Sequence, residues 1–428
     1  QEPMFRFHTS RAVYKGMLKF LSSLYGSDYL VQPLPVDHLK TEFLPEGGIR
    51  LSWKPVSDPL ESTASPDRYR VYTRINGKSF DQGRTVDESF FIFEEPHPDS
   101  IYSFKVTALN GGGESFPSEV MSACRRSESK GRVLIISAFD RTGGAAWFED
   151  ENHAGFMPMI DQGVPWHKDL HTVGDQYDYQ KDSPWLDDDA PGFGASYADL
   201  EDVVIPGNSF DFPLTHGVSI VKAGYSFVSI SDEALEDDSL DIGDFQVIDF
   251  IAGEERTTFL PKNDSTPLYQ VFSPVMLDRL STFLGKGGGI FISGAHIASD
   301  VQLNGQDSVV ASLLKYKWRT SNASRLGGFY YMNEDFGAYE DTYHFNTGIH
   351  PEIYTLEGAD ALEPYDSTAE TLIRYRENNT SAAVAFKGSY GVVAMGFPFE
   401  TILEDSVRDE MMKKILKYLT EDGDHGQD

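Results

Sequence analysis

A helical pattern, a glycine run and a short apolar segment follow one another between residues 273 and 299, and this unit constrains the fold most. Ser273 followed by Pro274 is typical of a helix N-cap and first helical turn. Apolar residues then recur at helical spacing as far as Leu284. The glycines at 287–289 end this pattern, so we expect an amphipathic helix that stops there.

The apolar segment at 290–292 is too short and too β-branched for another helix, which predicts a buried strand. Small residues follow it, from Ser293 to His296, and allow a sharp turn. Open α/β sheets bind ligands at the carboxyl ends of their strands. We therefore expect a functional site at this turn.

Other continuous apolar runs have the length and composition of strands buried on both faces. They occupy residues 132–137, 226–230, 245–251, 382–386 and 391–395, with helical patterns between several of them and a last helix at 407–419. This alternation predicts a three-layer α/β domain with a mostly parallel sheet over residues 131–421.

Residues 36–126 have the strand spacing of a small sandwich. Trp53 alternates with apolar neighbours on one strand, residues 76–77 form an Asn-Gly turn, and Tyr102 is a candidate tyrosine corner. With the closing NGGGESFPSE motif, these features resemble a fibronectin type III domain. The resemblance implies an all-β domain that spaces or binds, and we assign no chemistry to it.

Charge and cysteine content exclude several classes of function. The chain has 36 basic and 67 acidic residues, a formal charge of -31, which disfavours nucleic acid and anionic lipid as partners. Its single cysteine, Cys124, cannot form an internal disulfide, and its apolar setting predicts a small buried strand residue. No apolar run approaches the roughly 20 residues of a transmembrane helix.

The segments outside the two domains have distinct patterns. Residues 1–35 contain a helical apolar stripe and a Pro-rich joint, which fits either the end of an upstream domain or a docking helix. The chain begins at Gln1, so we expect a processed product that has lost a signal peptide. The polar residues 127–131 predict a linker between separately folding domains, and 422–428 a disordered tail.

Residues 140–222 interrupt the α/β pattern with a long segment rich in aromatic and acidic residues. Its aromatic content argues for an ordered insertion over the carboxyl end of the first α/β strand. His167 and His171 have zinc-helix spacing but lack the HExxH glutamate, so we expect neither a metal nor a cofactor. We expect ligand contacts from the insertion and the strand ends, at Asp140, Trp147, Trp185, Asp188, Ser231 and Glu254.

The helix, glycine turn, strand and tight turn at 273–296 resemble the nucleophile unit of class I glutamine amidotransferase-like folds. In that family a cysteine stands where this chain has Ser293, and a histidine where it has His296. The resemblance implies a flavodoxin-like or amidotransferase-like domain with Ser293 and His296 as its catalytic candidates. Serine needs a nearby base, and the candidates are the histidines at 216, 296, 344 and 350.

The order of parts resembles secreted Bacteroidetes proteins described as xanthan lyase-like or as attached to N-acetylmuramoyl-L-alanine amidases. The stretches FDRTGGAAWFEDENHAGF, PWLDDDAPGFGASYADLE and AGYSFVSISDEAL carry this resemblance. It implies a secreted, periplasmic or cell-surface protein, here expected to be a monomer, that binds and in one reading cleaves a polysaccharide or peptidoglycan ligand. The alternatives are a non-catalytic surface module and an active serine-type hydrolase.

Overall fold

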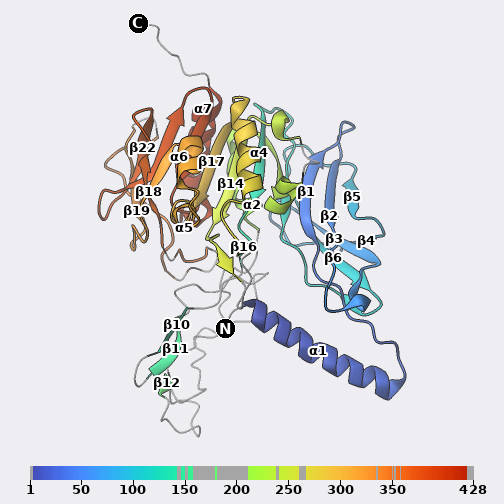
Figure 1. Cartoon of the computed structure of the whole chain (residues 1–428). Coiled ribbons are helices and arrows are strands. Elements are labelled where there is room, and N and C mark those ends of the chain that lie inside the picture. Colours follow the sequence, from blue (N-terminus) through green and yellow to red (C-terminus); the bar gives the residue numbers. More distant parts are fainter. Residues whose placement is uncertain are drawn as a thin grey trace.

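The structure is a computed structural model that describes residues 3–141, 146–149, 153–157, 179–180, 211–237, 241–259, 267–333, 336–348, 350, 353–356 and 358–421. After the helix α1 (Pro3–Tyr25), the chain forms a small β-sandwich and then a larger mixed sheet covered by helices (Figure 1). The tail at 422–428 lies outside the described residues.

The sandwich consists of two antiparallel sheets that face each other across an apolar core. One sheet contains β1 (Asp37–Phe43), β2 (Ile49–Lys54) and β5 (Phe90–Phe93). The other contains β3 (Arg68–Ile75), β4 (Arg84–Val86), β6 (Tyr102–Asn110), β7 (Gly113–Glu114) and β8 (Met121–Ala123).

Three local predictions for the sandwich are confirmed. Trp53 is 3% exposed and packs edge-on against Tyr69, with ring centroids 5.3 Å apart. The Tyr102 hydroxyl accepts a hydrogen bond of 2.8 Å from the backbone N–H of His97, the contact that defines a tyrosine corner. Asn76 and Gly77 have φ values of 50° and 72°, as a tight hairpin turn requires.

The centre of the large sheet is a set of parallel strands in the spatial order β13-β9-β14-β17-β24. Each corresponds to an apolar run expected to be a buried strand. Their bounds are β9 (Arg132–Ser137), β13 (Ser226–Ser231), β14 (Val247–Gly253), β17 (Gly289–Gly294) and β24 (Gly391–Met395).

Beyond β24 the sheet is antiparallel, so the whole sheet is mixed where the sequence predicts a mostly parallel one. The next strands are β23 (Ser381–Lys387), β22 (Ala369–Tyr375), β19 (Gly328–Tyr331) and β20 (Tyr343–His344). Only residues 388–390 separate β23 from β24. That connection is too short for a parallel crossover, so the two strands must form a hairpin.

Helices cover both faces of the sheet and give it three layers. On one face, α2 (Phe212–Ala223) and α7 (Asp405–Thr420) pack in one apolar cluster. On the other, α3 (Asp232–Glu236), α4 (Pro274–Gly285) and α6 (Asp307–Leu314) pack in a second. The predicted N-cap of α4 is confirmed, because the Ser273 hydroxyl accepts a 3.1 Å hydrogen bond from the Met276 N–H.

Short elements complete the described part of the chain. Within 140–222, the strands β10 (Ala146–Glu149), β11 (His153–Met157) and β12 (Tyr179–Gln180) form a separate antiparallel sheet. The others are η1 (Ser62–Ala64), η2 (Ile242–Asp244), β15 (Thr258–Phe259), β16 (Pro267–Tyr269), α5 (Ser299–Leu303), β18 (Tyr316–Thr320), β21 (Ala361–Pro364) and η3 (Phe399–Thr401).

The sandwich and the large sheet share one continuous sheet rather than meeting across a loose linker. Strand β1 lies antiparallel beside β13, with Lys40 opposite Ile230. The Thr41 hydroxyl bonds both backbone groups of Ser229 at 2.9 Å, donating to the carbonyl and accepting from the N–H. The edge of β13 is therefore covered by the sandwich.

Further contacts extend the boundary between the two domains, which we call the seam. Cys124 exchanges backbone hydrogen bonds of 2.9 and 3.0 Å with Phe227. It is fully buried, as expected for a small strand residue, and burial raises the pKa of its thiol to about 12. Arg74 of β3 donates two hydrogen bonds of 2.7 Å to the carboxylate of Asp211, at the start of α2. One core cluster runs through both domains.

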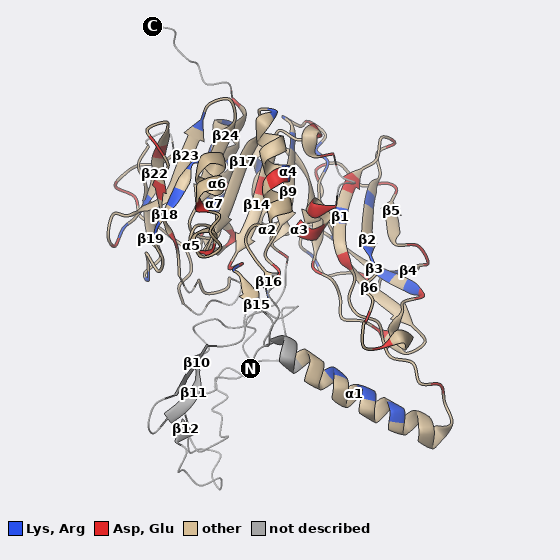
Figure 2. Cartoon of the chain, in the orientation of Figure 1, with Lys and Arg blue, Asp and Glu red and all other residues tan. Residues whose placement is uncertain are grey.

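The helix α1 has basic but no acidic residues, and Figure 2 shows them along its length. Arg11 pairs with Asp58 at 2.8 Å and Lys15 with Glu61 at 3.2 Å, which holds the helix to the sandwich. Its apolar stripe, including Met17 at 62% exposure, faces solvent. No described helix combines the length and apolar character needed to cross a membrane.

Candidate functional site

The strand order of the parallel region identifies where a ligand would bind. In chain order the parallel strands are β9, β13, β14, β17 and β24, so their spatial order is 2-1-3-4-5. The direction of winding changes between β9 and β14, and doubly wound sheets open a crevice at the carboxyl ends of those strands. Asp140 follows β9 at this edge, and Glu254 and Glu255 follow β14.

A helix cap orients the acidic residues that follow β13. The Ser231 hydroxyl, fully buried, accepts a 3.3 Å hydrogen bond from the Ala234 N–H and caps α3. Asp232 and Glu233 then occupy the first helical turn, where acidic side chains are favoured. Ser231, expected as a ligand contact, thus positions the two residues after it.

After β14, a tight turn positions the two glutamates that follow it. Gly253 has a φ of 46°, and a Cβ there would lie 2.1 Å from the ring of Phe139. The Glu255 N–H closes the turn on the Ala252 carbonyl at 2.7 Å. Both following glutamates are buried, Glu254 at 4% exposure and Glu255 at 2%. Only glycine permits this backbone approach, so the turn fixes where the two carboxylates lie.

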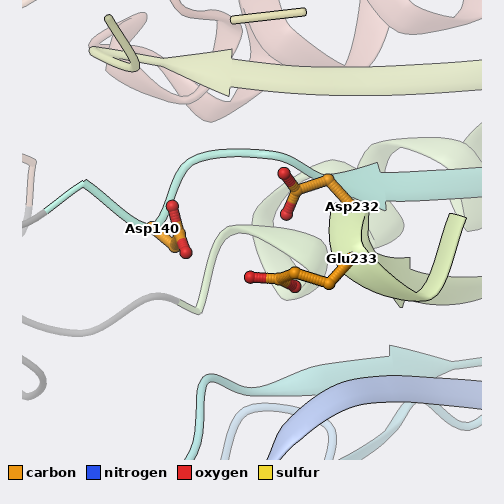
Figure 3. A group of neighbouring side chains, drawn as sticks. All are labelled: Asp140, Asp232 and Glu233. Atoms are coloured by element: carbon orange, nitrogen blue, oxygen red, sulfur yellow. The ribbon is translucent and has the colours of Figure 1, made fainter. Parts of the chain in front are cut away.

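Asp140, Asp232 and Glu233 bring their carboxylates together at this edge (Figure 3). One oxygen from each lies within 4.8 Å of the others, and all three residues are partly exposed. Burial, and then the charge of Glu233, raises the pKa of Asp140 and of Asp232 well above the usual range. We call these three residues the carboxylate cluster.

The sandwich also contributes acidic residues near the cluster. Burial, followed by the charges of Glu233 and Asp140, raises the pKa of Glu119 from the end of the sandwich. Burial and the charge of Asp37 on β1 raise the pKa of Glu233. The cluster therefore lies where the switch point of the parallel sheet meets the seam between the domains.

The predicted catalytic pair lies nearby, in a different environment. Ser293 is fully buried at the end of β17, and its hydroxyl has no hydrogen-bond partner among the described residues. Burial and the positive charges of Arg256 and Arg141 lower the pKa of His296 to about 3. A histidine with so low a pKa is a weak base near neutral pH. No hydrogen bond joins Ser293 to His296 in the described part of the chain.

His216 belongs to a second, sealed polar network. Its Nδ1 lies 2.8 Å from Asp249 of β14, and its Nε2 lies 3.2 Å from Glu400 of η3. The Tyr354 hydroxyl donates a 2.7 Å hydrogen bond to the other oxygen of Glu400. Burial alone lowers the pKa of His216, but the two carboxylates outweigh it and raise the pKa to about 9. His216 is 0% exposed and cannot reach a substrate.

The remaining predicted residues either lie on other elements or lie outside the described residues. His344 is exposed on β20, and His350 accepts a 3.1 Å hydrogen bond from the Ile353 N–H through Nδ1. Trp185 and Asp188 lie outside the described residues, as do His167 and His171, and for Trp147 only the backbone is described.

Sequence reasoning named Asp140 and Glu254 but missed Asp232, Glu233 and Glu255. The signal was present, because a pair of acidic residues begins within three positions of the end of each predicted strand, 226–230 and 245–251. What the sequence does not give is the spatial order of the strands, which decides whose ends meet.

Comparison with known families identifies one part of the chain. Residues 35–123 match the fibronectin type III domain model, so this region, expected at 36–126, is a fibronectin type III domain. No curated protein matches the chain.

Two solved structures each match less than a third of the chain. A twitchin kinase region from C. elegans is 20% identical and covers 28% of this chain and 19% of its own, with a TM-score of 0.20. The FN5 domain of Drosophila Lar is 23% identical and covers 22% of this chain and 98% of its own, with a TM-score of 0.18.

Proposed function

We propose that this chain is a ligand-binding part of an extracytoplasmic protein that processes envelope glycan, peptidoglycan or another polysaccharide. The ligand would contact the carboxyl edge of the parallel strands, around Asp140. The observation that carries the proposal is a difference in solvent exposure between the acidic residues and Ser293 at this edge. The carboxylate cluster is partly exposed at the switch point, whereas the nucleophile candidate Ser293 is fully buried.

The chemistry of the edge suits a ligand rich in hydroxyl groups. Carboxylates accept hydrogen bonds, and sugar hydroxyls donate them. Acidic residues from both domains surround Asp140, so a neutral or cation-bridged glycan would bind better than a bare polyanion. The aromatic side chains between Trp147 and Tyr197 remain an expected sugar-stacking surface and lie outside the described residues.

The buried serine favours recognition over hydrolysis. A serine nucleophile needs access to its substrate and a base that can take its proton. Ser293 has neither exposure nor a hydrogen-bonded base among the described residues, and the low pKa of His296 makes it a poor proton acceptor. We therefore assign no turnover to this pair.

The finer class of the second domain and the wider relationship belong to the same proposal. The 2-1-3-4-5 order of the parallel strands supports a flavodoxin-like domain related to class I glutamine amidotransferases, with serine in place of the nucleophilic cysteine. A fibronectin type III domain, common in extracellular proteins, supports secretion and the xanthan lyase-like grouping.

A paired assay for binding and product release tests this function. The full chain is titrated with peptidoglycan fragments, a neutral polysaccharide and xanthan, and each mixture is assayed for new reducing ends and unsaturated uronates. We expect binding without product release, and Ser293→Ala should bind like the parent. Product release by the parent that Ser293→Ala abolishes would instead establish a serine hydrolase.

A further inference from the structure

The geometry of the carboxylate cluster fits a single bound ion. Asp140 comes from the loop after β9, and Asp232 and Glu233 come from the first turn of α3 (Figure 3). Calcium binds oxygen ligands at about 2.4 Å, so two ligands of one ion lie at most about 4.8 Å apart. The three carboxylate oxygens meet that limit, and their partial exposure leaves a path for an ion.

A fourth carboxylate, that of Glu255, provides an observation that does not depend on the three cluster residues. Glu255 is 2% exposed, and its Oε2 accepts hydrogen bonds from the N–H groups of Asp140 at 3.3 Å and Arg141 at 3.0 Å. Its Oε1 is buried and has no hydrogen-bond partner among the described residues. A buried carboxylate oxygen without a donor is unfavourable, and a cation would satisfy it.

The carboxylate of Glu255 lies next to the carboxylate cluster, on the Asp140 side. Its Oε2 accepts a hydrogen bond from the Asp140 N–H, so Oε1 of the same carboxylate also lies near the loop that contains Asp140. The Glu255 carboxylate therefore lies against the loop that carries Asp140.

Ordinary structural roles explain only part of this arrangement. Acidic residues in a first helical turn are common, which accounts for Asp232 and Glu233 but not for Asp140 beside them. No lysine or arginine forms a salt bridge with Asp140, Asp232 or Glu233 within the described ranges. The positive charge of Arg141 offsets the raised pKa of Glu255 only in part, and such an excess of negative charge is the environment that a bound metal ion neutralises.

We propose that Asp140, Asp232 and Glu233 bind one hard divalent cation, of the calcium class, at the switch point of the sheet, beside the buried carboxylate of Glu255. The ligands are all carboxylate oxygens, which hard cations prefer and which disfavour zinc or copper. They come from separate segments, which suits the adaptable coordination of calcium better than the rigid octahedron of magnesium. The inference goes beyond the proposed function and requires no glycan.

Calcium titration of the full chain after dialysis against EDTA tests this site. Isothermal titration calorimetry with CaCl₂ alone should show one site per chain at up to about 1 mM free calcium, the range of extracellular modules. The melting temperature should rise with calcium. Asp232→Asn and Glu233→Gln should each weaken binding at least about tenfold and remove that rise. The matched control Asp278→Asn, at an exposed position on α4, should behave like the parent.

The melting temperatures of the variants in EDTA distinguish a loss of calcium binding from a loss of folding. Removing one charge from a repulsive cluster should leave the melting temperature in EDTA equal to or above that of the parent. A variant that melts lower in EDTA is replaced by Asp140→Asn, which tests the same site from another strand end. Absence of calcium binding by the parent, or equal binding by parent, Asp232→Asn and Glu233→Gln, would overturn the proposal.

Discussion

Replacing His216 by glutamine should change how stability depends on pH. In the folded chain, Asp249 and Glu400 hold the pKa of His216 at about 9, against an ordinary value near 6.5 in the unfolded chain. The protonated form is thus favoured by folding. Its stabilisation is fully present below pH 6.5 and is lost as pH rises through 9.

The magnitude follows from the difference between the two pKa values. Each pKa step of one corresponds to about 1.4 kcal/mol, so a rise from 6.5 to about 9 corresponds to about 3 kcal/mol of unfolding free energy. His216→Gln should also be less stable at pH 6.5 by about 3 to 5 kcal/mol, because it leaves two buried carboxylates without their cation.

Urea unfolding at several pH values between 6 and 9.5 measures both effects. The parent should lose about 3 kcal/mol more than His216→Gln across this window. His344→Gln makes the same change at an exposed histidine and should follow the parent. If the parent and His216→Gln lose stability in parallel, His216 is not held protonated by its neighbours and the reasoning fails.

Three further predictions concern the fold. Trp53→Ala should lower the unfolding free energy by about 3 to 5 kcal/mol in urea, and a loss under about 1 kcal/mol would contradict its burial. Gly253→Ala should lower the unfolding free energy by about 2 to 4 kcal/mol, because the backbone there is left-handed and the added Cβ would clash with Phe139. An unchanged midpoint of urea unfolding would refute this. A chain starting at Lys130 should not unfold cooperatively, because β13 loses its covering strand; a soluble product with a sharp transition would show that the seam is dispensable.

Much of the fold was predictable because its signals are local. The buried strands are continuous apolar runs, and Ser273, Tyr102 and the turn at 76–77 each form contacts with near neighbours in the chain. The sequence reasoning did not single out β23 as antiparallel, although the short connection at 388–390 determines that direction. Chain length between strands, not composition, carried that information.

The seam and the carboxylate cluster depend on contacts between distant parts of the chain. Thr41 and Ser229 are 188 positions apart, and nothing in the two sequences indicates that they pair. At the switch point, sequence reasoning chose Glu254, although it is Glu255 whose carboxylate accepts a hydrogen bond from the Asp140 N–H. Which residue at a turn faces a site depends on backbone geometry that residue types alone do not fix.

Glycan binding by Asp140→Asn, compared with the parent and Asp278→Asn, tests the central claim most directly. The claim is that the ligand binds at the carboxyl edge around the cluster. Calorimetry with the best-binding oligosaccharide, in excess calcium and again in EDTA, should show at least about tenfold weaker binding by Asp140→Asn in one or both conditions. The control Asp278→Asn should match the parent in both. Equal affinities for all three proteins in both conditions would place the ligand site elsewhere and contradict the account.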